Sequence, residues 1–297
     1  MPDTNLKLRV DLLRAADLKN YENAPNPIDP EYAWHFLAEG DSWFTIGAIP
    51  SSNLLFELKL AKWTRVLSIA YPGDTIVNIG DLAGNKDLRK FLVKTGFNYP
   101  FHALLLSGGG NDVIDAAKKI IKPGKAPAGS NEPDDYIDQA ALRAKLDEIQ
   151  KGYAKIVSLR DSATSLSQGS PVFVHTYDYP TPRNAPATFV GAIPVLGPWL
   201  YPVFKDTGLD IGLQQRIVNR VMDELAQALL DLDSVHGDPD KSLPAFHVID
   251  TRNTLVQANP SEIGNSNDWL NEIHPNHDGY RKVADRLSTA INAVMLG

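Results

Sequence analysis

The sequence predicts an α/β protein with one doubly wound parallel sheet and helices on both faces, a three-layer α/β/α arrangement. Three observations support this prediction. The chain of 297 residues is 43% hydrophobic and 22% charged, which is typical of a globular protein with a large core. Short apolar runs predict buried strands, and segments of helical periodicity lie between them. We expect a single domain over residues 1–297.

Five apolar runs predict the strands of the sheet. Each run is short and apolar at both alternating positions, as in parallel strands that are buried on both faces. The runs cover residues 34–39, 65–70, 102–107, 171–177 and 245–250.

Apolar residues at helical spacing predict three long helices, each with one buried face. The repeats are Leu142, Leu146, Ile149, Tyr153 and Ile156; Leu213, Ile217, Val221, Leu225 and Leu229; and Tyr280, Val283, Leu287 and Ile291.

Two insertions interrupt this alternation. Residues 122–138 are polar and predict a solvated loop. Residues 180–210 are apolar but broken by Pro194, Pro198 and Pro202, so neither a helix nor a central strand suits them. We interpret this segment either as a lid or pocket wall, or as a part of the main core.

Composition excludes several classes of protein. The net charge of −7 provides no general surface for nucleic acid or anionic lipid. The absence of cysteine excludes disulfides, thiolate nucleophiles, iron–sulfur clusters and cysteine zinc sites. No apolar run approaches the length of a membrane span, and no export signal is visible. We therefore expect a cytoplasmic protein by default, with a mature exported chain as the alternative.

The strongest local motif is Gly40-Asp41-Ser42-Trp43, directly after the first predicted strand. Ligands bind at the carboxyl ends of strands in doubly wound sheets, so this position presents Ser42 at a site. A serine hydroxyl is a poor nucleophile unless a base takes its proton. The motif therefore requires a histidine on another strand end.

His274 is the histidine that best suits this role. It lies in the loop before the C-terminal helix, where Pro275 stiffens the backbone and Asn276 suits the helix N-cap. The four histidines within predicted strands are better explained as structural residues. His274 and His277 also suggest a metal pair, but no third ligand motif accompanies them, and we expect no metal.

Two glycine-containing loops supply candidate donors for an oxyanion. Gly73 allows close approach to a backbone N–H group, and the turn at Gly108–Gly110 directs the side-chain amide of Asn111 toward the same edge of the sheet. A phosphate-binding loop is disfavoured because no Gly-Lys-Ser/Thr follows the glycines. The G-x-S-x-G motif of α/β-hydrolases is also absent, since Phe44 replaces its second glycine.

Together these motifs resemble the four sequence blocks of the SGNH (GDSL-type) hydrolase superfamily, in order and over residues 34 to about 290. The resemblance implies a flavodoxin-like sheet. It also implies that Ser42 is the nucleophile, that His274 is the base, and that Ser42, Gly73 and Asn111 form the oxyanion hole.

One position departs from this pattern, because Asn271 stands where the superfamily has the aspartate of Asp-x-x-His. Asp268, three residues earlier, is our first candidate for the acid. Asn271 as an uncharged orienting residue, and a Ser–His dyad supported by a backbone carbonyl, are the alternatives.

Three aspartates near these motifs also have structural interpretations. Asp41 and Asp112 adjoin tight turns, where aspartate commonly bonds to backbone N–H groups. Asp178 suits a substrate contact and a structural turn equally well. Trp43 is better explained as a core residue than as a pocket wall.

The sequence thus predicts a serine esterase that cleaves small-molecule esters of acyl or carbohydrate type, without metal or organic cofactor. Acyl transfer by the same site is one alternative. A binding module that has lost catalysis is another. Nothing in the sequence indicates the oligomeric state.

Overall fold

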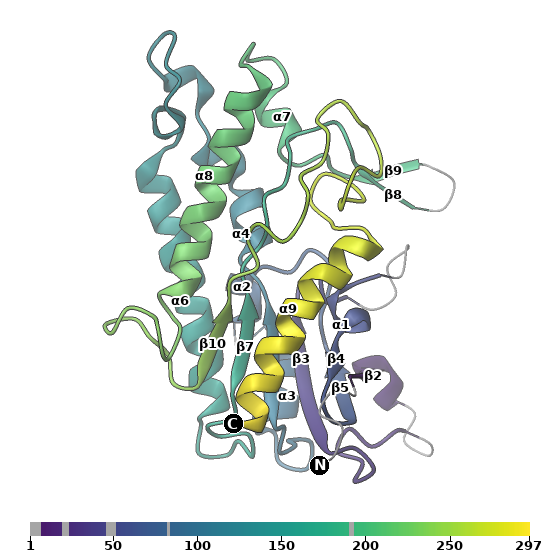
Figure 1. Cartoon of the computed structure of the whole chain (residues 1–297). Coiled ribbons are helices and arrows are strands. Elements are labelled where there is room, and N and C mark those ends of the chain that lie inside the picture. The colour runs from purple at the N-terminus through teal and green to yellow at the C-terminus, as the bar shows by residue number, and fades with distance from the viewer. Residues whose placement is uncertain (1–6, 20–23, 46–51, 82–83, 190–192) are drawn as a thin grey trace.

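The computed structural model describes residues 7–19, 24–45, 52–81, 84–189 and 193–297. A six-stranded sheet, parallel throughout, crosses the molecule in the order β10-β7-β6-β3-β5-β2 (Figure 1). Its strands are β2 (Asp11–Arg14), β3 (Trp34–Gly40), β5 (Thr64–Ser68), β6 (Ala103–Ser107), β7 (Val172–His175) and β10 (Phe246–Ile249).

The strand order confirms the predicted fold class. Counted from β3, the five predicted strands have the order 2-1-3-4-5 of flavodoxin-like sheets. The edge strand β2 was not predicted. It has only four residues, of which Leu13 alone is buried, so no apolar run reveals it.

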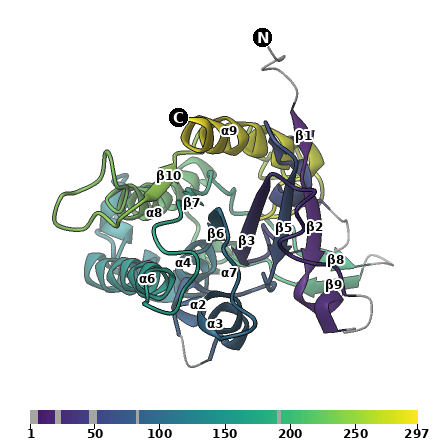
Figure 2. The ribbon, with the colours of Figure 1, turned by 90° about the horizontal axis from the view of Figure 1, so that it is seen from below.

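Helices cover both faces of this sheet (Figure 2). One face carries α1 (Leu54–Glu57) and α9 (His277–Leu296), and the other carries α2 (Ile76–Ile79), α3 (Lys86–Val93) and α6 (Gln139–Arg160), with α8 (Ile211–Leu230) packed beside α6. The three long helices are the predicted ones, and every apolar residue that predicted them is buried. The remaining elements are short: β1 (Leu8–Arg9), η1 (Ala15–Lys19), β4 (Lys59–Leu60), α4 (Gly110–Asp115), α5 (Ala117–Ile120), η2 (Pro123–Lys125), η3 (Pro133–Tyr136), β8 (Ala187–Phe189), β9 (Ile193–Leu196) and α7 (Tyr201–Phe204).

The two predicted insertions contain little regular structure. Residues 122–138 form η2 and η3 and are closed by a bridge between Ile121 and Ile137. Residues 180–210 form the β8–β9 hairpin and α7, and residues 190–192 of this segment lie outside the described residues. The interpretation of residues 180–210 as a lid stays a prediction.

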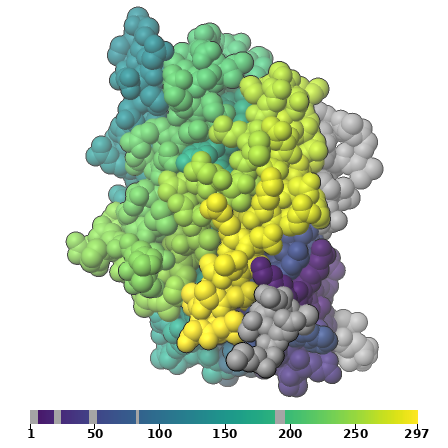
Figure 3. Space-filling view, in the orientation of Figure 1, coloured from purple at the N-terminus to yellow at the C-terminus, as the bar shows by residue number. Residues whose placement is uncertain are grey.

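The register of the sheet brings the motif loops together. Gly40 on β3 pairs with Ser107 on β6, so the Ser42 and Asn111 loops begin at the same level of the sheet. A Cβ atom at Gly40 would lie 2.5 Å from the carbonyl oxygen of Ser107, which explains why glycine occupies this position. The loops after β7 and β10 reach the same end of the molecule, where the C-terminal quarter of the chain forms much of the visible face (Figures 1 and 3).

Candidate active site

Ser42 follows β3 in a turn that Asp41 stabilises. The Asp41 carboxylate accepts the N–H of Trp43 at 3.0 Å, and its backbone carbonyl accepts the Thr45 hydroxyl at 2.9 Å. These bonds confirm the structural interpretation of Asp41. They leave the half-buried Ser42 side chain at the wall of a cavity that is also lined by Asn111, Tyr177 and Trp269.

The hydroxyl of Ser42 contacts the imidazole of His274, a residue 232 positions later in the chain. The distance from Ser42 Oγ to His274 Nε2 is 2.7 Å, a normal hydrogen-bond length. The two residues therefore share a proton position without any movement of either loop. His274 precedes α9, which begins with the predicted N-cap Asn276.

Asn271 determines which nitrogen of His274 carries the proton. Its Oδ1 atom accepts the backbone N–H groups of Ile273 at 3.1 Å and His274 at 2.9 Å. Because backbone N–H groups only donate, the oxygen of this amide must face them. The same oxygen lies 3.0 Å from His274 Nδ1, so Nδ1 carries the hydrogen and Nε2 is free to accept from Ser42.

Asp268, our first candidate for the acid, does not contact His274. Its carboxylate accepts the backbone N–H of Val256 at 2.7 Å and the ammonium group of Lys282 at 2.5 Å. Lys282 lies on α9, so Asp268 attaches the histidine loop to that helix. The expectation that Asp268 holds the imidazole was therefore wrong, and the alternative residue Asn271 occupies that position.

Burial lowers the pKa of His274 to about 4. Among the described residues, the partner of its Nδ1 is the uncharged amide oxygen of Asn271, which supplies no negative charge to oppose this effect. At neutral pH the ring is uncharged and its Nε2 lone pair is available, which is the state that a general base requires.

The candidate oxyanion donors lie in the loops after β3 and β5 and in the first turn of α4, which follows β6. Asn111 uses one N–H of its side-chain amide to bond the carbonyl of Asp74 at 3.0 Å, which leaves the second N–H unused by that contact. The backbone N–H groups of Ser42 and Gly73 donate to no other described residue. Gly73, with φ of +79°, is exposed and does not line the cavity beside Ser42. Its loop is held near Ser42 by the bond from Tyr71 N to Gly40 O.

A second serine–histidine contact lies deeper in the protein. Ser107 Oγ is 3.0 Å from His175 Nε2 and donates to Asp41 at 2.7 Å, and the hydroxyl of Tyr177 also donates to Asp41. Ser107 and His175 are completely buried, and neither lines the cavity beside Ser42. We interpret this network, which the sequence did not reveal, as support for the Ser42 turn. Trp43 belongs to both settings: its buried ring stacks on His175, and it also lines the cavity beside Ser42.

Asp112 and Asp178 are anchors for loops. Asp112 accepts the backbone N–H groups of Ile76 and Val77, as predicted. Asp178 accepts four backbone N–H groups, those of Tyr179, Asn253, Thr254 and Leu255. These bonds favour the structural interpretation of Asp178.

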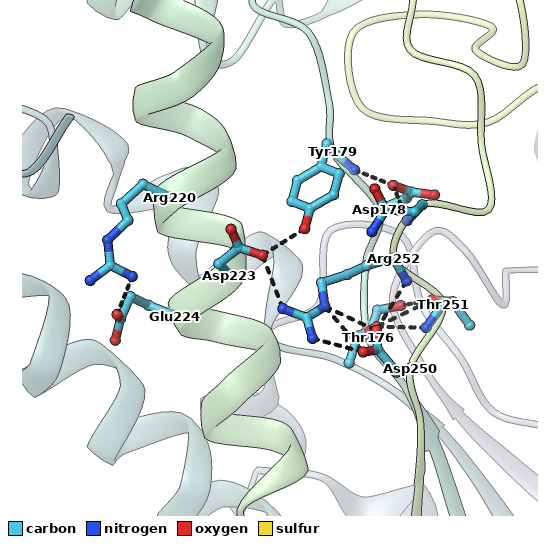
Figure 4. Close-up of polar contacts among 10 residues, drawn as sticks. Thr176, Asp178, Tyr179, Arg220, Asp223, Glu224, Asp250, Thr251 and Arg252 are labelled. Atoms are coloured by element: carbon cyan, nitrogen blue, oxygen red, sulfur yellow. Dashed lines mark hydrogen bonds and ion pairs between the residues drawn. The ribbon is translucent and has the colours of Figure 1, made fainter. Parts of the chain in front are cut away.

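The ends of β7 and β10 are joined to α8 by a polar network (Figure 4). Tyr179 donates its hydroxyl to Asp223 of α8 at 2.6 Å, and Arg252 bonds both Asp223 and Asp250. Burial, together with the hydrogen bond to Asp223, raises the pKa of Tyr179 to about 12. The network adjoins the Ser42 cavity, whose walls include the neighbouring residues Asp178, Pro180 and Met222.

Glu272 joins the histidine loop to the second insertion, another feature that the sequence did not reveal. The carboxylate is buried and accepts the backbone N–H groups of Leu200 at 2.9 Å, Tyr201 at 2.7 Å and Arg183 at 3.1 Å, together with that of Trp199. Burial raises the pKa of Glu272, and the four donors oppose that rise. The ring of Trp199 also meets the ring of His274, with centroids 5.7 Å apart.

Within the described residues, no group of three or more histidine, aspartate or glutamate side chains is arranged to hold a metal ion. His277 instead lies against the buried Glu57, with Nε2 3.2 Å from Oε1. Among the helices of the same residues, none is long and apolar enough to cross a membrane.

Comparison with known proteins gives matches only among solved structures. No protein family and no curated protein matches the sequence. A lipase from a goat rumen metagenome is 14% identical, with 86% of this chain and 96% of that chain covered and a TM-score of 0.44. The extracellular lipase of Streptomyces rimosus is 15% identical (85% and 98% covered, TM-score 0.45), and the aryl esterase of M. smegmatis is 16% identical (87% and 98% covered, TM-score 0.41). At these values, the function of this chain has to be inferred from its own side chains.

Proposed function

We propose that this chain is a serine esterase of the SGNH type that hydrolyses carboxylic esters of small molecules through an acyl-enzyme on Ser42. The observation that carries the proposal is the distance of 2.7 Å between His274 Nε2 and the Oγ of Ser42, a residue at the wall of a cavity. Nucleophile and base lie within hydrogen-bond reach, and the base is oriented by a third residue.

In the proposed first half-reaction, Ser42 Oγ attacks the acyl carbon while its proton passes to His274 Nε2. The carbonyl oxygen becomes an oxyanion, for which the Asn111 amide and the backbone N–H groups of Ser42 and Gly73 are the proposed donors. Collapse of this tetrahedral intermediate breaks the bond to the alcohol. His274 returns the proton to the departing alkoxide, and an acyl ester remains on Ser42.

In the second half-reaction, His274 takes a proton from water, and the resulting nucleophile attacks the acyl ester. The same donors stabilise the second oxyanion, and the proton then passes from His274 to Ser42 Oγ as the carboxylic acid departs. Every proton that is moved in these steps starts and ends on Ser42, His274, water or a product.

The proposed role of Asn271 is to orient the ring of His274 and to hold the hydrogen on Nδ1. An aspartate at this position would also stabilise the imidazolium by its charge. Asn271 supplies no charge, so the positive charge that His274 acquires must be stabilised mainly by the developing oxyanion.

A panel of p-nitrophenyl esters from acetate to palmitate tests the proposal. We expect turnover by the wild-type chain and a loss of at least about 10³-fold in Ser42→Ala. A fluorophosphonate reagent should label Ser42 in the wild-type chain, as determined by peptide mass spectrometry. Equal turnover by both proteins, or label on another serine, would contradict the assignment. Product analysis with added alcohol distinguishes hydrolysis from acyl transfer.

A further inference from the structure

Two cavities meet at Ile114 and Met222. The first lies beside Ser42 and Asn111. The second lies behind it, between α4–α5 and α8, and both cavities have Ile114 and Met222 in their walls. These two side chains are therefore the partition between the candidate active site and a second space.

The second cavity is lined by hydrophobic side chains alone. Its walls include Ala117 of α5, Val218 of α8 and Leu200 from the insertion that Glu272 holds in place, and all three are buried or nearly so. A narrow apolar space of this kind disfavours water and accepts apolar groups. Nothing in the mechanism proposed above uses it.

Both spaces are narrow in the present structure. By the space that one water molecule requires, the cavity at Ser42 has room for about one or two water-sized groups and the cavity behind it for about one. An acetyl methyl group fits the first cavity. A longer acyl chain that enters this space would meet Ile114 and Met222 at the partition.

The position of Asn111 directs the acyl group toward this partition. Asn111 and Ile114 are three residues apart on α4, and residues at this spacing share one face of a helix. A carbonyl oxygen held by the Asn111 amide therefore places the attached acyl group on the side of Ile114. Met222 faces the same space from α8, where Val218 one turn earlier lines the second cavity.

We infer that the chain is specific for esters of short acyl groups, acetyl above all, and that Ile114 and Met222 determine this limit by separating the Ser42 cavity from the apolar cavity behind it. This inference rests on the proposed esterase function. It also implies that the second cavity can accept the end of a longer acyl chain once the side chain of Ile114 or Met222 is shortened.

The test measures kcat/KM for p-nitrophenyl acetate, butyrate, hexanoate and octanoate. The wild-type chain should prefer acetate. In Ile114→Ala, the ratio of hexanoate to acetate should rise about fourfold for each additional methylene that becomes buried. Met222→Ala should shift the ratio in the same direction. A matched control is Ile156→Ala, which removes the same atoms from α6 where they line neither cavity.

A compensating double variant built on Ile114→Ala gives a second test, which does not depend on the folding of Met222→Ala. Ala117 lines only the second cavity, so adding Ala117→Leu to Ile114→Ala should refill that space and restore the preference for acetate. Circular dichroism establishes that each variant is folded. An unchanged ratio in folded Ile114→Ala, or a ratio that Ala117→Leu leaves high, would overturn the inference while the esterase function stands. Absence of any turnover by the wild-type chain would instead remove the function on which the inference rests.

Discussion

Asn271 Oδ1 lies 3.0 Å from His274 Nδ1 and accepts the backbone N–H of the same histidine at 2.9 Å. One side-chain oxygen thus fixes both the ring and the backbone of the candidate base. The arrangement is purely local, since the two residues are three positions apart, and it needs no carboxylate.

Asn271→Ala should therefore reduce kcat far more than Asp268→Asn. Without Oδ1, the ring of His274 can rotate or exchange its tautomer, which we expect to lower kcat by roughly 10²- to 10⁴-fold. Asp268→Asn alters a contact to Lys282 and should leave kcat within about threefold, because Asp268 touches neither reacting side chain. Steady-state kinetics on one ester compares the two variants. The opposite order would restore Asp268 as the acid.

The pH dependence of kcat/KM should extend unusually far into acid. His274 must be neutral to accept a proton, and burial lowers its pKa to about 4, below its usual value near 6.5. Activity should thus stay level from pH 8 to about pH 5 and fall by half near pH 4. Assay at pH 7 after incubation in acid separates protonation from unfolding. A half-maximum near pH 6.5 would show that the ring is more solvated than its burial indicates.

Asn271→Asp should move the acid limb of the same profile upward. A carboxylate at Nδ1 favours the charged imidazolium and raises the pKa of His274. The variant preserves the shape of the side chain and the acceptor for both backbone N–H groups, so it isolates the effect of charge. A profile identical to that of the wild-type chain would mean that a charge on residue 271 does not affect the pKa of His274.

Ser107→Ala should retain most of the activity that Ser42→Ala loses. Ser107 is completely buried and supports the turn through Asp41, so its removal should lower the free energy of unfolding by about 1–3 kcal/mol. Thermal or urea unfolding measures that loss, and the ester assay measures turnover. Loss of activity in well-folded Ser107→Ala would make the buried serine the better candidate for the nucleophile.

Glu272→Gln should destabilise the junction between the histidine loop and residues 199–201. The amide nitrogen of glutamine would face backbone donors and leave them unsatisfied, at a cost of about 1–3 kcal/mol for each buried donor. We expect a lower melting temperature and faster amide hydrogen exchange at Leu200 and Tyr201. The exposed Glu262→Gln is the control. Unchanged exchange would show that the segment is held by its apolar contacts alone.

Much of the fold could be predicted because its signals are local. The strands β3, β5, β6 and β7 are buried along most of their length, so each stands out as an apolar run. The edge strand β10 has only Phe246 buried, but Val248 and Ile249 keep its sequence apolar, whereas the half-exposed edge strand β2 shows no such run. Ser42 and Asn111 could be placed at one edge of the sheet because each directly follows a predicted strand. His274 could be placed there because it directly precedes the predicted helix α9.

The remaining features depend on packing between distant segments. The donors to Glu272 lie 71 to 89 residues away in the sequence, and the network at Ser107 joins three strand ends, so no spacing in the sequence reveals either. The role of Asn271 did have a local signal, because an asparagine two or three residues before backbone N–H groups commonly bonds to them. Asp268 is the stronger candidate from sequence alone because an aspartate can stabilise the imidazolium by its charge.

The contact between Gly40 and Ser107 restricts which amino acids residue 40 can accept. Any side chain at residue 40 would separate two central strands at the level where the nucleophile emerges. Substitution there would alter the spacing between the serine and the amide of Asn111 even if the protein still folded. Residue 40 should therefore tolerate substitution far less than residues in the exposed loops do.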